Sequence, residues 1–182
     1  MTATTAPAVT AVPFLTRQEI ERRAEGVLRS HGLGMIPIDP VVLANHLGMS
    51  VHNAKFADDN LVGMIAKRGD TVTLLVNATD PPARKRFTIA HELGHHFLHL
   101  LSDGEFVDAE TNLFRGAVEE DASMTPERRQ EIQANLFAVA LLMPEARVRE
   151  EWLRIGSVDL MARRFNVSQT AMGYRIAQLG LD

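Results

Sequence analysis

The segment His91-Glu92-Leu93-Gly94-His95 contains three side chains that could take part in chemistry. On an α-helix, residues at i and i+4 share a face, so both histidines can direct a ring nitrogen at one metal ion. Glu92 is rotated about a quarter turn from them, where its carboxylate can reach a water molecule instead of the ion. The spacing therefore predicts a hydrolytic zinc site. The ion would lower the pKa of the water, Glu92 would accept a proton, and the water oxygen would attack a carbonyl carbon.

A third ligand is needed, because a catalytic zinc ion takes three protein ligands and keeps one position open. The chain has no cysteine, so this ligand must be a histidine or a carboxylate. Glu131 begins a helical face that continues with Ala134, Asn135 and Ala138. Small side chains let that helix lie close to the first, so we expect Glu131 to be the ligand and Asn135 to orient a ligand by a hydrogen bond. The alternative for Glu131 is an exposed glutamate on an amphipathic helix.

Two other interpretations of the histidines are open. His99 lies four residues after His95, so this pair could also bind an ion, but His96 would then occupy the position of the base. We therefore expect His96 beside the site or facing solvent. The second interpretation is a surface helix that merely contains histidines, and the apolar residues at helical spacing around the motif argue against it. These residues are Phe87, Ile89, Ala90, Leu93, Phe97, Leu98 and Leu101.

Capping and periodicity signals place these residues in an α+β fold. Asp80-Pro81-Pro82 predicts the start of the helix that carries the histidines, over about residues 82–101. Thr125-Pro126 predicts the start of the helix that carries Glu131, over about residues 126–143. Earlier in the chain we expect two helices, and three strands that form a small antiparallel sheet. The helices start at Thr16 and Asp39, and the strands cover residues 50–56, 61–67 and 71–76, with a hairpin turn at Arg68-Gly69-Asp70.

Two segments show neither helical nor strand periodicity. Residues 1–13 consist mainly of Ala, Thr and Pro and predict a disordered tail. Residues 102–124 are polar and rich in acidic side chains, and they predict a long connection without regular structure. A loop of this length near the site could act as a lid or select the substrate.

Composition and charge exclude several classes of protein. The 182 residues carry a net charge of -4, so we expect no nucleic-acid-coating surface over the whole molecule. The absence of cysteine excludes disulfides, iron–sulfur clusters and thiol nucleophiles. The N-terminus lacks the pattern of a signal peptide, and no apolar stretch is long enough for a membrane span, so we expect a cytoplasmic protein.

Two segments together resemble the ImmA/IrrE family of metallopeptidases: RFTIAHELGHHFLH at residues 86–99 and EIQANLFAVALLMP at residues 131–144. The order of the expected elements is also similar. The resemblance implies a mostly helical, zincin-like core and a gluzincin-like site, with His91, His95 and Glu131 as metal ligands and Glu92 as general base. It further implies a biological role, since members of this family cleave helix-turn-helix repressors that control mobile elements or stress responses.

Residues 157–182 predict a pair of short helices joined at Asn166-Val167-Ser168, similar to a helix-turn-helix. Three arginines form a small basic cluster here, so contact with DNA through the second helix is one interpretation. They are Arg163, Arg164 and Arg175. The second helix offers few side chains that could read bases, so we prefer a helix pair that packs on a metallopeptidase domain of residues 14–156.

We therefore expect an endopeptidase with one Zn²⁺ per chain, acting on a regulatory protein such as a helix-turn-helix repressor; Mn²⁺ or Fe²⁺ could occupy the same ligands. Two alternatives are a non-proteolytic, metal-containing regulator that binds DNA or a partner protein, and a toxin-like member of a toxin–antitoxin pair. The sequence leaves open which residue stabilises the oxyanion, with Tyr174, His96 and His99 as candidates.

Overall fold

The computed structural model describes residues 15–58, 61–99, 104–109 and 124–181. The expected disordered tail, residues 1–13, and most of the expected 102–124 connection lie outside these ranges. Within them the elements follow in the order α1 (Arg17–Ser30), α2 (Pro40–His46), β1 (Ser50–Ala54), β2 (Leu61–Arg68), β3 (Thr71–Asn77), α3 (Pro82–Leu98), β4 (Gly104–Ala109), α4 (Pro126–Leu142), α5 (Glu145–Ile155), α6 (Val158–Phe165) and α7 (Gln169–Gln178). The predicted α+β class is confirmed.

Local capping bonds explain where several helices begin. The Thr16 hydroxyl accepts a hydrogen bond from the Glu19 amide at 3.2 Å, and Asp39 accepts one from the Val41 amide at 3.0 Å. At the start of α4 the Thr125 hydroxyl accepts from the backbone amide three residues later, at 3.3 Å. Each bond satisfies an amide that would otherwise lack an intrahelical partner. These helix starts are therefore encoded locally.

The four strands form one sheet in the order β1-β3-β2-β4. The expectation of an antiparallel sheet was wrong in one respect, because β1 pairs with β3 in parallel. The chain reverses between β1 and β2 and again between β2 and β3, where Gly69 has a positive φ of 57°. Two reversals restore the original direction, and β4 occupies the other edge of β2. β1 can therefore extend the sheet only as a parallel neighbour of β3.

Strand β4 corrects a second expectation, since Gly104–Ala109 falls inside the segment 102–124 that was expected to lack regular structure. It pairs antiparallel with β2, with Val107 opposite Met64 and Phe106 opposite Ile65. Because acidic residues flank these two apolar residues, the sequence shows no clear strand pattern here. Its register depends on β2, which is distant along the chain.

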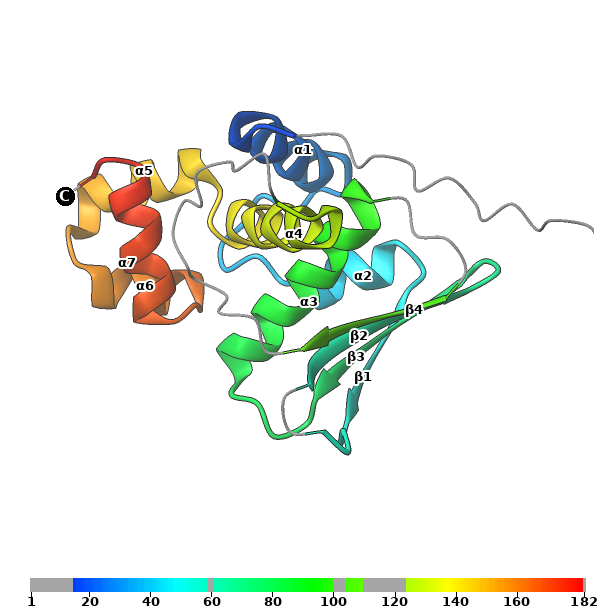
Figure 1. The fold of residues 1–182 in the computed structure, drawn as a ribbon. Helices are drawn as coiled ribbons and strands as arrows, with labels where there is room; N and C mark the ends of the chain where they lie inside the picture. Colours follow the sequence, from blue (N-terminus) through cyan, green and yellow to red (C-terminus); the bar gives the residue numbers. More distant parts are fainter. Residues whose placement is uncertain (1–14, 59–60, 100–103, 110–123, 182) are drawn as a thin grey trace, which may run out of the picture.

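Helix α3 lies against the sheet, α4 packs on α3, and α1 packs on α4 (Figure 1). Helices α5, α6 and α7 lie together on one side of this stack. The core between the layers contains apolar side chains with no exposed surface, which is the main favourable term for such a fold. They include Ile20, Ile65, Leu74, Leu93, Phe137 and Leu141. None of the helices in the described part of the chain has both the length and the apolar character needed to cross a lipid bilayer.

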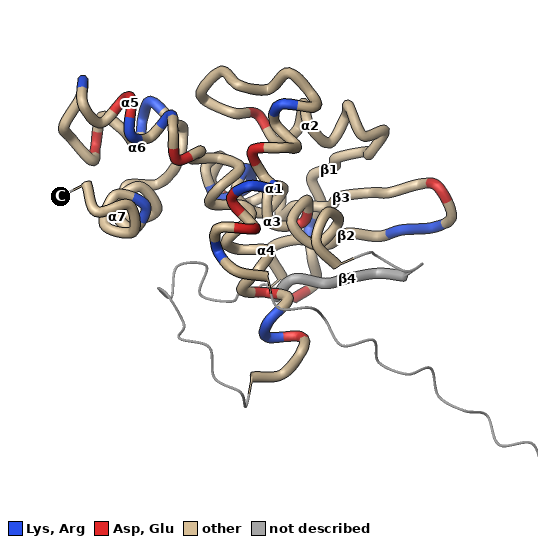
Figure 2. Tube along the Cα trace, turned by 90° about the horizontal axis from the view of Figure 1, so that it is seen from above, with Lys and Arg blue, Asp and Glu red and all other residues tan. Residues whose placement is uncertain are grey.

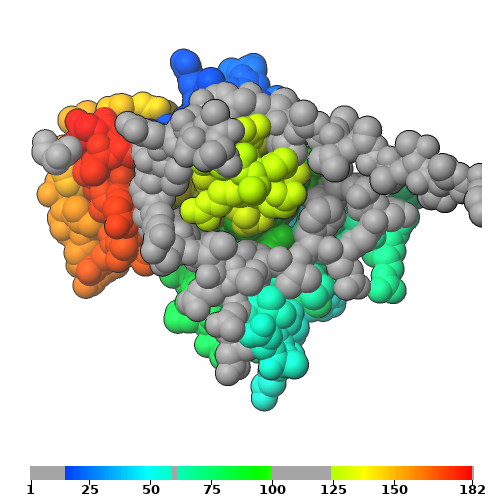
Figure 3. All heavy atoms as spheres, in the orientation of Figure 1, coloured from blue at the N-terminus to red at the C-terminus, as the bar shows by residue number. Residues whose placement is uncertain are grey.

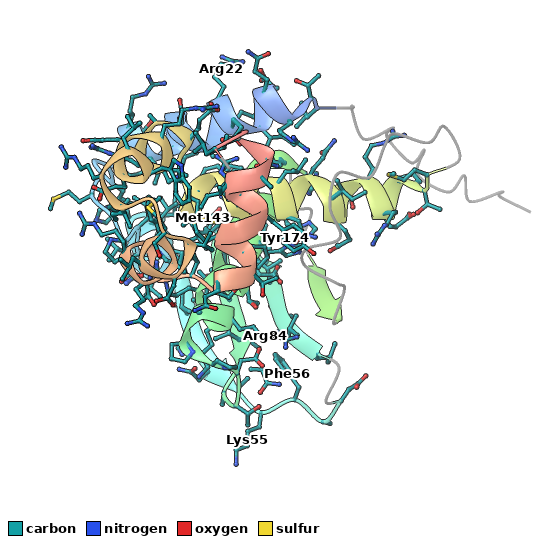
Figure 4. The ribbon with its side chains drawn as sticks, turned by 90° about the vertical axis from the view of Figure 1, so that its left-hand side faces the viewer. Arg22, Lys55, Phe56, Arg84, Met143 and Tyr174 are labelled. Carbon is teal, nitrogen blue, oxygen red and sulfur yellow. The ribbon has the colours of Figure 1, made fainter. Side chains whose placement is uncertain are left out.

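Arg175 connects α7 to α1 through hydrogen bonds. Its guanidinium donates to both carboxylate oxygens of Glu21 on α1, at 2.5 and 2.8 Å, and to the carbonyl of Met143 at 3.0 Å. Figure 4, which faces α7, shows Met143 at this helix. Arg175 is only 1% exposed, so its charge is committed to the interior and is not part of a surface cluster.

Candidate metal centre

The middle of α3 buries three ionisable side chains. His91 is 0% exposed, Glu92 is 1% exposed and His95 is 6% exposed. Burying such groups is costly unless other polar or charged groups compensate for the lost water. These three positions therefore require partners from the elements that cover α3, which are α4 and the sheet.

Three donor atoms converge between α3 and α4. The Nε2 atoms of His91 and His95 are 2.9 Å apart, and each lies 3.3 Å from one carboxylate oxygen of Glu131. Ligand atoms of the three residues all lie within 4.8 Å of one another. Two atoms bound to a tetrahedral ion at about 2.0–2.1 Å would be roughly 3.3 Å apart. The spacing and the two-imidazole, one-carboxylate donor set therefore fit a single divalent ion of the size of zinc.

Close packing of the two helices brings Glu131 within reach. A Cβ atom added at Gly94 would lie 2.9 Å from the Cα and carbonyl oxygen of Ala134. The rings of Phe97 and Phe137 stack beside this contact, with centroids 5.6 Å apart. Small residues at the crossing point thus allow the short approach that a shared ligand set requires.

Glu92 lies on the side of α3 that faces β2. A Cβ atom added at Gly63 would be 3.1 Å from Glu92 Oε1 and 2.4 Å from Thr88 Cγ2. Only glycine fits there without displacing the carboxylate or its neighbour. Gly63 also stands at a register shift between β2 and β4. Gly63 was not among the site residues predicted from the sequence, although a glycine inside a strand pattern often marks a bulge or a close approach.

The outer nitrogen of each buried histidine has a hydrogen-bond partner. His91 Nδ1 lies 2.9 Å from Asn135 Oδ1, which is the kind of contact expected for Asn135. His95 Nδ1 lies 3.1 Å from His99 Nδ1, and His99 Nε2 lies 3.1 Å from Gln133 Oε1. Both ring nitrogens of His99 are therefore engaged, which argues against His99 as an oxyanion donor. The buried Gln133 was not identified from the sequence.

Comparison with known proteins agrees with this geometry. Residues 44–177 match the Peptidase_M78 family model, described as the IrrE N-terminal-like domain. The chain belongs to this family. It is therefore a metallopeptidase, as predicted.

Relatives in the family differ in how much of their length the chain covers. The chain is 24% identical to the metallopeptidase ImmA of Bacillus subtilis over 93% of its own length and 90% of that protein. It is 30% identical to the radiation response metalloprotease IrrE of Deinococcus radiodurans, over 58% of its own length and 30% of that protein. Among solved structures it resembles a Mycobacterium tuberculosis transcriptional regulator, with a TM-score of 0.64 and 22% identity over 88% of this chain and 46% of that one. This last likeness supports the fold alone.

The electrostatics of the centre favour the protonation states that a metal ion needs. Burial raises the pKa of Glu131, but the hydrogen bonds to His91 and His95 outweigh burial and hold that pKa well below its ordinary value. Burial lowers the pKa of His95, although Glu131 partly opposes the shift. Burial, followed by the neighbouring His95, lowers the pKa of His99 to about 4. An ionised Glu131 beside a neutral His95 is the protonation state in which these two side chains could bind a metal ion.

His96 and Tyr174, the other two candidates for oxyanion stabilisation, are not members of the donor cluster. The ring of His96 meets Phe97 edge-on, and burial together with the charge of Lys67 lowers the His96 pKa. Tyr174 is 52% exposed on α7. His96 is partly exposed and follows the clustered His95 directly, and it is not one of the three clustered residues.

Glu131 is the most exposed of the three clustered side chains. Its side chain is 28% exposed, whereas those of His91 and His95 are 0% and 8% exposed. In Figure 3 the yellow-green side of α4 faces the viewer, and a small green area of α3 is visible directly below it.

The arginines of the C-terminal helix pair are balanced by carboxylates. Arg163 pairs with Asp159 at 2.9 Å, and Arg164 approaches Glu151 at 3.5 Å. Figure 2 shows basic and acidic residues interspersed over α5 and α6. With Arg175 buried as well, the basic cluster that suggested DNA contact is dispersed in the structure.

Proposed function

We propose that the chain is a zinc endopeptidase that cleaves a regulatory protein. In this proposal His91, His95 and Glu131 hold the zinc ion and Glu92 is the general base. The observation that carries it is the triangle of donor atoms between α3 and α4, with the buried Glu92 carboxylate next to it. Membership of a metallopeptidase family supports the same reaction.

Zinc bound by these ligands would lower the pKa of a water molecule and polarise the scissile carbonyl. Glu92 accepts the proton of the attacking water and then donates it to the departing amine. The close approach of β2 at Gly63 limits the positions open to the Glu92 carboxylate. Asn135 keeps the His91 ring oriented so that Nε2 faces the ion.

The proposed substrate is a helix-turn-helix repressor, and cleavage would relieve repression of stress-response or mobile-element genes. The resemblance to ImmA and IrrE motivates this choice, and the name of the Deinococcus relative refers to a radiation response. A repressor substrate also implies a cytoplasmic enzyme.

We further propose that residues 157–182 support the metallopeptidase domain, residues 14–156, and do not bind DNA. The burial of Arg175 against Glu21 and the pairing of Arg163 support this division of roles. A DNA-binding surface gains affinity from cations that can reach phosphates. An electrophoretic shift of operator DNA by the purified protein at low salt would contradict this proposal.

The function is tested by comparing protein N-termini in the native host expressing the wild-type chain or Glu92→Gln. We expect a new N-terminus within a helix-turn-helix protein, under normal or stress conditions, that depends on Glu92. Identical N-termini in the two strains under every condition would contradict the protease proposal. A regulator with a structural metal, or a toxin-like partner, would then account better for the chain.

A further inference from the structure

The two clustered histidines are held in different ways by the same helix. His91 Nδ1 contacts Asn135 directly, at 2.9 Å. His95 Nδ1 instead contacts His99, which in turn contacts Gln133 of α4. Helix α4 thus supplies one carboxylate to the donor triangle and, two and four residues later, the anchors for both imidazoles. The longer route through His99 has no role in the steps of the proposed reaction.

The order of donors and acceptors along this route is determined by its ends. A histidine that offers the Nε2 lone pair to an ion carries its proton on Nδ1, so His95 Nδ1 donates to His99 Nδ1. His99 then has its own proton on Nε2, which donates to the Gln133 carbonyl oxygen. Every donor in this sequence meets an acceptor. In the reverse order, the proton of His95 would lie on Nε2, and that nitrogen could not bind an ion.

The hydrogen-bonded chain from His95 through His99 to Gln133, called the relay below, is shielded from water at its Gln133 end. Gln133 is 2% exposed and His95 is 6% exposed, whereas His99 between them is partly exposed. Leaving a partly buried N–H group of His99 without its acceptor costs free energy. The contact with the Gln133 oxygen therefore favours one proton arrangement over the other.

We propose that Gln133 is a positioning residue that acts through His99 to hold His95 in the tautomer that binds the metal ion. The proposal rests on the ligand set of the proposed function. Neither Gln133 nor His99 belongs to the donor triangle. Their effect is therefore expected first in metal affinity, and in activity only where the metal is partly lost.

The test compares zinc dissociation constants, measured by competition with a chromophoric chelator. Gln133→Leu removes the acceptor at similar size, whereas Gln133→Glu retains an acceptor oxygen. We expect Gln133→Leu to weaken zinc binding roughly 10- to 100-fold, the usual effect of losing such a partner, and Gln133→Glu to restore most of it. Gln130→Leu, the same change three residues earlier on α4, is the matched control. Thermal unfolding of the zinc-free proteins checks that each variant folds.

A second pair of measurements distinguishes a relay from general packing. His99→Phe interrupts the same chain, so the His99→Phe/Gln133→Leu double variant should bind zinc no more weakly than either single variant. In nitrogen-15 NMR spectra of the zinc-free proteins, the fraction of His95 that carries its proton on Nδ1 should be larger in the wild type than in Gln133→Leu, because the Glu131 carboxylate, 3.3 Å from His95 Nε2, favours the other tautomer. Additive losses, an unchanged tautomer, or equal affinities of Gln133→Leu and Gln133→Glu would overturn the proposal.

Failure of the relay can be told apart from failure of the proposed function. If the wild type binds one zinc ion that is lost in His91→Ala, the ligand set stands whatever Gln133→Leu shows. If His91→Ala leaves zinc binding unchanged, the ligand set itself is wrong. The relay would then have no metal ligand to position and would be overturned as well.

Discussion

The metal centre and the contact between α7 and α1 both bury charged or ionisable groups, but they satisfy them differently. Around Arg175, guanidinium donors meet carboxylate and carbonyl acceptors from Glu21 and Met143. Around Glu131, a carboxylate meets two imidazole nitrogens that also face each other at 2.9 Å. The first cluster is complete by itself and serves stability. The second is the proposed metal site, where a cation would satisfy the three donor atoms at once.

Removing the base should produce the largest effect on catalysis. We expect Glu92→Gln to lower the rate of substrate cleavage about 10²- to 10⁴-fold, the usual contribution of a general base. Zinc affinity should be unchanged, because Glu92 is not in the donor triangle. The cleavage rate is measured on the substrate identified by its new N-terminus. A variant that still cleaves at the wild-type rate would refute the role of Glu92.

Disrupting the contacts of Arg175 with Glu21 should lower stability and leave the metal centre intact. Arg175→Met leaves the partly buried Glu21 carboxylate without its partner, which we expect to lower the free energy of unfolding by about 3–5 kcal/mol. Adding Glu21→Leu should recover part of this loss. Urea unfolding of the zinc-free proteins measures both changes. Arg163→Met breaks an exposed pair with Asp159 and should cost at most about 0.5 kcal/mol.

Substituting Glu131 should have the opposite effect, weakening metal binding and leaving stability largely intact. We expect Glu131→Ala to weaken zinc binding by more than about 100-fold, because loss of a direct ligand should exceed the effect of losing an outer partner. Glu127→Ala, an exposed glutamate in the first turn of α4, is the control and should leave zinc affinity unchanged. Equal zinc affinities of the two variants, measured by chelator competition, would remove Glu131 from the ligand set.

Gly63→Ala should affect the proposed base, Glu92, without affecting the proposed metal ligands. The new methyl group would press on Thr88 and Glu92, and a misplaced catalytic group can cost about 10²-fold in rate. We expect a 10- to 100-fold slower reaction, on that basis, with unchanged zinc affinity. Gly26→Ala is the control, because its Cβ would meet no atom within 4 Å. Wild-type activity of Gly63→Ala would show that β2 does not constrain Glu92.

Much of the metal centre could be predicted from the sequence because the relations involved are short-range. The i, i+4 spacing of His91 and His95 determines a shared face once a helix forms. The start of α3 follows from its adjacent prolines, and that of α4 from Pro126 and the capping bond of Thr125. The expected helix over about 82–101 corresponds to Pro82–Leu98, and that over about 126–143 to Pro126–Leu142.

The features that the sequence did not indicate depend on residues far apart in the chain. Glu21 and Arg175 are 154 positions apart, and His99 and Gln133 are 34 apart. No local sequence pattern indicates that residues so far apart will be in contact. The parallel pairing of β1 with β3 and the edge position of β4 likewise depend on which strand edges the rest of the sheet leaves available.

The sequence by itself therefore determined the helices, the shared helical face of His91 and His95, and the choice of Glu131 as a candidate ligand. Only the tertiary structure decided that Gly63 faces the base, that Gln133 ends a chain of hydrogen bonds from His95, and that Arg175 is buried. The physical reason is the range of the interactions. Helical periodicity and capping act within a few residues, whereas packing and burial are properties of the whole chain once its helices and sheet have assembled.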